Sequence, residues 1–100
     1  MKDVYIVSAK RTAVGSLKDM SPALFGAEVV KAIVEETKID TKDIDEVIIG
    51  NILPAGQGQG VARQVAVHGG VDISVPAYSL NMACGSGMKA LMIAYTSISS

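Results

Sequence analysis

The sequence predicts a layered α/β fold with substantially parallel strands. Three short apolar runs have the length and composition of strands, at residues 4–7, 47–53 and 75–83. Helical patterns lie between them, and such alternation of strand and helix is typical of parallel sheets covered by helices. With 49% hydrophobic residues in a chain of 100, the sequence also carries ample apolar surface for a core.

The first strand and the first helix are predicted before residue 40. Residues 4–7, "VYIV", form a β-rich apolar run of the kind found in strands covered on both faces, and residues 8–16 should form a polar loop. Ser21 suits an N-cap and Pro22 the first position of a helix over residues 23–34. Most of this helix should be buried, because its charges gather in one narrow sector: Glu28, Lys31 and Glu35.

The middle of the chain should hold a helical turn, a strand and a short helix. The turn is expected within residues 39–46, and the apolar run at 47–53 is expected to be a buried strand. "PAGQGQG", residues 54–60, is predicted to be a flexible loop because glycine recurs in it. A helix over residues 61–67 should follow and should end at the glycines after His68.

The third strand, at residues 75–83, alternates small or polar with larger side chains, so its two faces differ. A last helix should begin near Ser86 and run toward Ser100. Lys89 is the only charged residue between Ile73 and Ser100, which leaves this helix without a polar face for water. We therefore expect residues 1–100 to be the N-terminal part of a larger protein.

Charge and cysteine content exclude several classes of function. Nine basic and ten acidic residues give a net charge of −1, so the chain lacks the excess of positive charge that would attract nucleic acid or an anionic membrane. One cysteine and one histidine cannot form a disulfide or a structural zinc site. No signal peptide and no run of about 18–20 apolar residues is visible. We expect a cytoplasmic protein without metal, membrane or nucleic-acid partners.

Two glycine-containing functional motifs are excluded, because the glycines do not stand at the positions that each motif requires. A dinucleotide motif in "GQGQG" would need glycine where Val61 or Arg63 stands. A hydrolase elbow centred on Ser86 would need glycine at the positions of Cys84 and Met88. Elsewhere, His68 is interpreted as an exposed residue complementing a helix dipole. Lys10 and Arg11 could bind phosphate, although a salt bridge or a solvated loop is the favoured interpretation.

Cys84, the only cysteine, lies where the third strand should end and the last helix begin. Free N–H groups and the positive end of the dipole at a helix start favour the nucleophilic thiolate. The same N–H groups could bind the oxyanion formed when a carbonyl is attacked. Gly85 and Gly87 have no side chains to block a substrate. The residues alone leave open whether Cys84 is a nucleophile in a pocket or an inert core residue.

Three segments resemble the N-terminal region of thiolases, the acetyl-CoA C-acetyltransferases, in order and spacing: "VYIVSAKRTAVGS", "DEVIIGNILPAGQGQGVARQ" and "YSLNMACGSGMKAL". The N-x-x-C-G-S-G block beginning at Asn81 is the most specific part, since ketoacyl synthases surround their cysteine differently. The resemblance implies a layered α-β-α-β-α fold in the full protein. Residues 1–100 would then be the start of its N-terminal half.

The resemblance also implies a reaction with Cys84 as the catalytic nucleophile. Cys84 would hold an acetyl group as a thioester and pass it to a second acetyl-CoA, giving acetoacetyl-CoA, or the reverse steps would cleave a 3-ketoacyl-CoA. Coenzyme A thioesters are the implied substrates, and no tightly bound cofactor is expected. The family's proton-transferring histidine and second cysteine lie in its C-terminal part, and His68 matches neither.

A homodimer or homotetramer is implied as well, with the strand at residues 75–83 paired across a two-fold axis. Met82 departs from the family pattern, in which a basic residue commonly follows the asparagine, and the change affects local contacts more than the chemistry. "CGSG" resembles the acetoacetyl-CoA type more than the long-chain degradative type. The alternatives are a ketoacyl-synthase or hydroxymethylglutaryl-CoA-synthase relative, or a non-catalytic thiolase-like lipid carrier or fragment.

Overall fold

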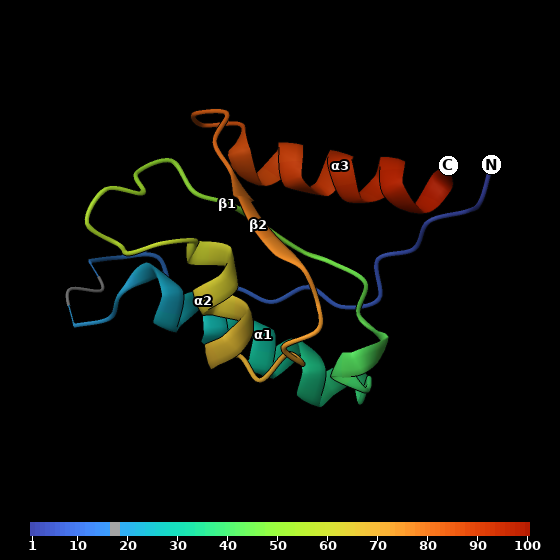
Figure 1. Cartoon of the computed structure of the whole chain (residues 1–100), viewed down its shortest axis with the longest axis horizontal. Coiled ribbons are helices and arrows are strands. Elements are labelled where there is room, and N and C mark those ends of the chain that lie inside the picture. Colours follow the sequence, from blue (N-terminus) through green and yellow to red (C-terminus); the bar gives the residue numbers. More distant parts are fainter. Residues whose placement is uncertain (17–18) are drawn as a thin grey trace.

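The computed structural model describes residues 1–16 and 19–100 and has three layers. Helix α3 (Ser86–Ser99) lies on one side of a two-stranded sheet, and helices α1 (Pro22–Thr37) and α2 (Val61–His68) lie on the other (Figure 1). The strands are β1 (Val47–Gly50) and β2 (Ala77–Leu80), and a short 3₁₀ helix, η1 (Thr41–Asp43), precedes β1. The predicted α/β layering is confirmed.

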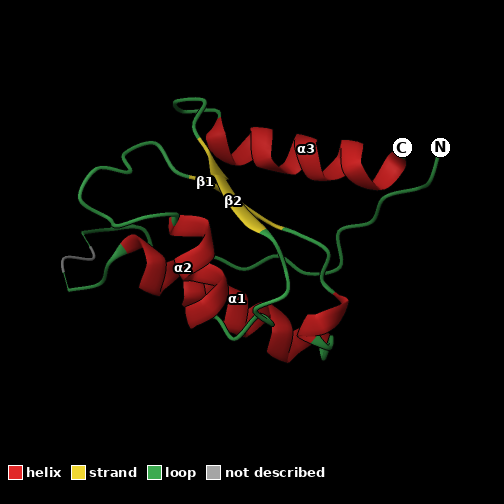
Figure 2. Ribbon diagram, viewed as in Figure 1, coloured by secondary structure: helices red, strands yellow, loops and turns green. Residues whose placement is uncertain are grey.

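The two strands are parallel, as the alternation predicted. Val47 lies opposite Ala77, and Gly50 lies opposite Leu80. Helix α2 makes the connection between them, which places it on one face of the sheet (Figure 2). Both strands are shorter than the predicted runs at residues 47–53 and 75–83, because the ladder ends where Asn51 N–H donates to Leu80 O at 2.9 Å.

The start of α1 follows from its first residues. Ser21 Oγ accepts a hydrogen bond from Leu24 N–H at 3.3 Å, and Pro22 occupies the first position of the helix. These are the cap and the start that the sequence predicted. The helix ends at Thr37, and Lys38 then adopts a left-handed conformation with φ of 56°.

The core lies between α1, α2 and the sheet. Val65 of α2 is 1% exposed and packs with Ala23 of α1 and Val61. A Cβ on Gly26 would lie 2.8 Å from Val65 Cγ2, so the glycine allows the two helices to approach closely. A second buried group extends the core toward the start of the strands: Ala66, Val71 and Val75.

The strand predicted at residues 4–7 was wrong. This segment is irregular, and Tyr5, Ile6 and Val7 are exposed. A strand requires a neighbour that completes its hydrogen-bond ladder, and among the described residues only β1 and β2 pair in this way. Polar contacts hold the segment instead. Lys2 N–H donates to Ser99 O at 3.2 Å, and an ion pair joins Lys10 to Glu36.

Helix α3 presents half-exposed apolar side chains, in agreement with its predicted lack of a polar face. They are Met88, Leu91, Met92, Tyr95 and Ile98. In the part of the chain that the structure describes, no helix has both the length and the apolar character needed to cross a membrane.

Candidate active site

Cys84 lies in the turn between β2 and α3, just before the first helical residue, Ser86. The predicted position between a strand and a helix is confirmed, although β2 ends at Leu80 rather than at residue 83. Cys84 is exposed to solvent and forms no disulfide. Among the described residues, Cys84 is therefore not packed in the core.

Two backbone hydrogen bonds form the turn around Cys84. Gly85 N–H donates to Met82 O at 3.0 Å, and Ser86 N–H donates to Ala83 O at 3.1 Å. The Ser86 hydroxyl adds two more, since it accepts from Met82 N–H at 2.8 Å and donates to Ala83 O at 2.6 Å. These bonds connect the residues before Cys84 directly to the start of α3.

Ala83 has a left-handed backbone conformation, with φ of 47°. For a residue with a Cβ this region costs about 1–2 kcal/mol. Asn81 helps to hold it, because its Oδ1 accepts from Ala83 N–H at 3.0 Å in a local turn. The residue immediately before Cys84 is thus fixed by hydrogen bonds in a conformation that alanine rarely adopts.

The start of α3, close to Cys84 in the sequence, has backbone N–H groups that form no hydrogen bond among the described residues. Among the described residues, no acceptor is found for the N–H groups of Cys84, Gly87 and Met88. Such unpaired donors and the helix dipole make a helix start attractive to negative charge. A Cβ on Gly87 would have no neighbour within 4 Å, whereas one on Gly85 would lie 2.7 Å from Met82 Cε. Of these two glycines, Gly87 is therefore the one that borders open space.

The glycine-rich segment between β1 and α2 lies beside this turn. Asn81 Nδ2 donates to Ile52 O at 3.0 Å, which ties the segment to the cysteine turn. Gln57 is held at both ends, because its Oε1 accepts from Asn51 Nδ2 at 3.0 Å and its carbonyl accepts from Gln64 Nε2 at 2.7 Å. The predicted loop is confirmed, and hydrogen bonds from Asn51, Gln64 and Asn81 anchor it.

The other polar residues considered from the sequence lie elsewhere. His68 is exposed at the last residue of α2, while the first turn of α2 touches β2 through Ala62 N–H and Ser79 Oγ at 2.9 Å. Lys10 forms the ion pair with Glu36, and Arg11 donates to Thr12 O at 3.2 Å. The salt-bridge interpretation of Lys10 is confirmed, and neither cation contacts the cysteine turn.

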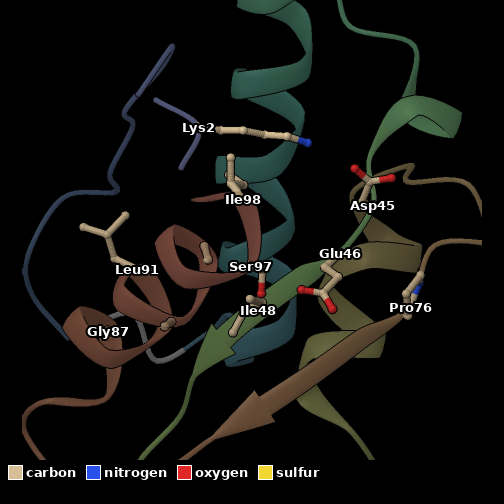
Figure 3. Close-up of a pocket in the computed structure, with 11 residues that line it drawn as sticks. Lys2, Asp45, Glu46, Ile48, Pro76, Gly87, Leu91, Ser97 and Ile98 are labelled. Carbon is tan, nitrogen blue, oxygen red and sulfur yellow. The ribbon is translucent and has the colours of Figure 1, made fainter. Parts of the chain in front are cut away.

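A cavity of about 860 Å³ lies between α3 and β1 (Figure 3). Ile48, Leu91 and Ile98 give it an apolar lining, and Lys2, Asp45 and Glu46 bring charged groups to it. Gly87 borders it, but Cys84 does not. The pocket expected around the thiol is therefore not this cavity.

A family model described as "Thiolase, N-terminal domain" matches residues 4–100 of the chain. The match covers the cysteine turn, both strands and all three α-helices. It also includes residues 4–7, although no strand forms there.

Curated bacterial proteins are similar over nearly the whole chain. A probable acetyl-CoA acyltransferase of Staphylococcus epidermidis is 45% identical over 98% of this chain and 26% of its own length. An acetyl-CoA acetyltransferase of Pseudomonas aeruginosa is 47% identical over 91% of this chain and 24% of its own length. The chain thus spans about a quarter of these relatives.

A solved structure has the same arrangement of elements. A thiolase from Ascaris suum, crystallised in complex with coenzyme A, superposes with a TM-score of 0.72 and 32% sequence identity. The similarity covers 77% of this chain and 20% of that chain. Over that part, the chain has the fold of one segment of that thiolase.

Proposed function

Because the chain belongs to the thiolase family, we propose that the protein carrying it is an acyl-CoA acyltransferase that works through a thioester on Cys84. One observation carries the proposal: Cys84 is exposed and lies just before α3, where the N–H groups of Gly87 and Met88 find no acceptor among the described residues. Relatives named acetyl-CoA acyltransferase and acetyl-CoA acetyltransferase support the same class of activity.

The first step is transfer of the acyl group to Cys84. The thiolate attacks the carbonyl carbon of an acyl-CoA, and the carbonyl oxygen becomes an oxyanion. Donors such as the N–H groups of Gly87 and Met88 are the kind that stabilise this charge. The bond to the coenzyme A sulfur then breaks, the coenzyme A thiolate takes up a proton, and Cys84 is left as the acetyl thioester.

The second step forms or breaks a carbon–carbon bond. A second acetyl-CoA loses an α-proton to a base, and its carbanion attacks the Cys84 thioester. Acetoacetyl-CoA leaves and the Cys84 thiolate is restored. In the reverse direction, Cys84 attacks the β-carbonyl of a 3-ketoacyl-CoA, and the carbanion of acetyl-CoA leaves and takes up a proton. Free coenzyme A then takes the acyl group from Cys84 as a new thioester, which completes the thiolysis and restores the thiol. The family's histidine and second cysteine for these proton transfers match no residue here, so this chain supplies the nucleophile and not the base.

Coenzyme A thioesters are the proposed substrates, and the solved thiolase of Ascaris suum was crystallised in complex with coenzyme A. The "CGSG" sequence at Cys84 favours a short acetyl group. We also propose a cytoplasmic location and a homodimer or homotetramer, the latter because residues 75–83 carry no charge to oppose pairing with a second copy.

The experiment is replacement of Cys84 in the protein as its gene encodes it. We expect Cys84→Ala to abolish both condensation of acetyl-CoA and thiolysis of acetoacetyl-CoA. Ser97→Ala, at an exposed position near the other end of α3, should leave both rates unchanged. Activity of the alanine variant close to that of the wild type would refute the assignment.

A further inference from the structure

We infer that Ser86 is a positioning residue that holds Cys84 in the orientation needed for acyl transfer. The inference rests on the proposed function and adds a residue to it. Ser86 is 3% exposed and is the only polar side chain in the described part of the chain that is this deeply buried. A buried hydroxyl needs hydrogen-bond partners, and those of Ser86 both lie in the cysteine turn.

The Ser86 hydroxyl bridges the two residues that precede Cys84. It accepts from Met82 N–H at 2.8 Å and donates to Ala83 O at 2.6 Å, so its one hydrogen and one lone pair are both used inside the turn. Because Ser86 is also the first residue of α3, these bonds fix the turn relative to the helix start. Without the hydroxyl, Met82 N–H would lose its acceptor.

Ala83 explains why such a restraint matters for the thiol. Its φ of 47° lies in a region that alanine leaves when nothing holds it there. A rotation at Ala83 would change how the backbone presents the next residue, Cys84, at the start of α3. Exposed Asn81 restrains the turn, because its Oδ1 accepts from Ala83 N–H at 3.0 Å and its Nδ2 donates to Ile52 O at 3.0 Å. Buried Ser86 supplies the second restraint.

The test measures how fast Cys84 is acetylated by acetyl-CoA in a single turnover, with the protein as its gene encodes it and intact mass spectrometry as the readout. Ser86→Ala should slow acetylation about 10- to 100-fold, as misplaced reacting groups do, while KM for acetyl-CoA changes little. Ser86→Thr keeps the hydroxyl and should recover most of the rate. Ser97→Ala, in the same helix, should match the wild type.

An acetylation rate of Ser86→Ala within about twofold of the wild type would overturn the inference. If circular dichroism shows that Ser86→Ala is unfolded, Asn81→Ala decides, because Asn81 is exposed. This variant should be acetylated about tenfold more slowly, and an unchanged rate would contradict the positioning role.

Failure of the proposed function would appear differently, as a wild-type protein that acetyl-CoA does not acetylate. In that case the pH profile of Cys84 alkylation by iodoacetamide still tests the turn, since it needs no acyl-CoA. The positioning role predicts that the Ser86→Ala profile differs from that of the wild type in midpoint or limiting rate. Superimposable profiles would refute it.

Discussion

Gly50, the last residue of β1, sets how closely α3 approaches the sheet. A Cβ at this position would lie 2.7 Å from the carbonyl carbon of Ser86 and 2.8 Å from the nitrogen of Gly87. Both are backbone atoms, which cannot move aside as the far end of a flexible side chain can. The missing side chain at Gly50 therefore lets the helix start, with the cysteine turn attached, rest directly on β1.

We expect Gly50→Ala to destabilise the fold by about 2 kcal/mol through overpacking and to slow acetylation of Cys84 by displacing the helix start. Gly15→Ala is the matched control, because a Cβ there has no neighbour within 4 Å. Urea unfolding and single-turnover acetylation measure the two effects. Equal unfolding midpoints for both variants would contradict the steric role of Gly50.

The sequence predicted some residues of the site and missed others for physical reasons. The position of Cys84 was predictable, since the glycine–serine–glycine break after an apolar run marks the start of a helix. The conformation of Ala83 was not, because alanine carries no preference for positive φ. The partners of Ser86 were not predictable either, since local sequence does not reveal which backbone groups a hydroxyl will meet in a folded turn.

Helices α1 and α2 pack against each other on one side of the sheet. Their contact centres on Val65, which is 1% exposed and lies against Gly26. The patterns of both helices were predictable to within a few residues, because Ser21, Pro22 and the glycines after His68 are strong local signals.

Val65→Ala should therefore lower the free energy of unfolding by about 2 kcal/mol, through lost apolar burial and the cavity that remains. Val67→Ala is the control, because Val67 belongs to the same helix but is 48% exposed. Its unfolding midpoint should stay close to that of the wild type. Equal losses in the two variants would show that α2 does not pack as described.

The segment at residues 4–7 shows the limit of prediction at the scale of elements. Its β propensity is high, but strand formation depends on a partner edge that the segment itself does not encode. In the structure the segment is instead followed by residues held to α1, where Ser8 Oγ donates to Glu36 Oε1 at 3.0 Å and Lys10 pairs with the same carboxylate.

These contacts make the stability of the fold depend on pH. The hydrogen bonds from Lys10 and Ser8, together with the charge of Lys10, hold the pKa of Glu36 below that of an ordinary glutamate. A lowered folded-state pKa stabilises the fold above the unfolded pKa, about 4.3, and the contribution is lost as the pH falls through the folded value. The difference in urea midpoint between wild type and Glu36→Gln should be small at pH 7, since the pair is exposed, and should vanish well below pH 4. A difference that grows on acidification would contradict this.

The molecule as a whole exposes more apolar surface on α3 than a solitary domain of this size would be expected to carry. Met88, Leu91, Met92, Tyr95 and Ile98 are each between 49% and 63% exposed. The relatives that match this chain are about four times its length, since it covers 26% of one and 24% of another. Both observations are consistent with the match to the N-terminal domain of thiolases.

We expect the polypeptide of residues 1–100, expressed alone, to associate in solution and to show no acyl transfer. Replacing Leu91 and Met92 with glutamate should reduce the association, because it places charge on the exposed face of α3. Sedimentation velocity measures the association of the unmodified and the substituted polypeptide. A monodisperse monomer of 10.4 kDa for the unmodified polypeptide would contradict the inference that this face needs a cover.

The central claim is that Cys84 carries the acyl group, and trapping the acyl enzyme tests it most directly. The protein as its gene encodes it is mixed with acetyl-CoA, quenched in acid, digested and mapped by mass spectrometry. We predict one acetyl group on the peptide that contains Cys84, lost on treatment with hydroxylamine as a thioester should be, and absent from Cys84→Ala. Acetylation at full stoichiometry in that variant, or a stable acetyl group on another residue of this chain, would contradict the claim.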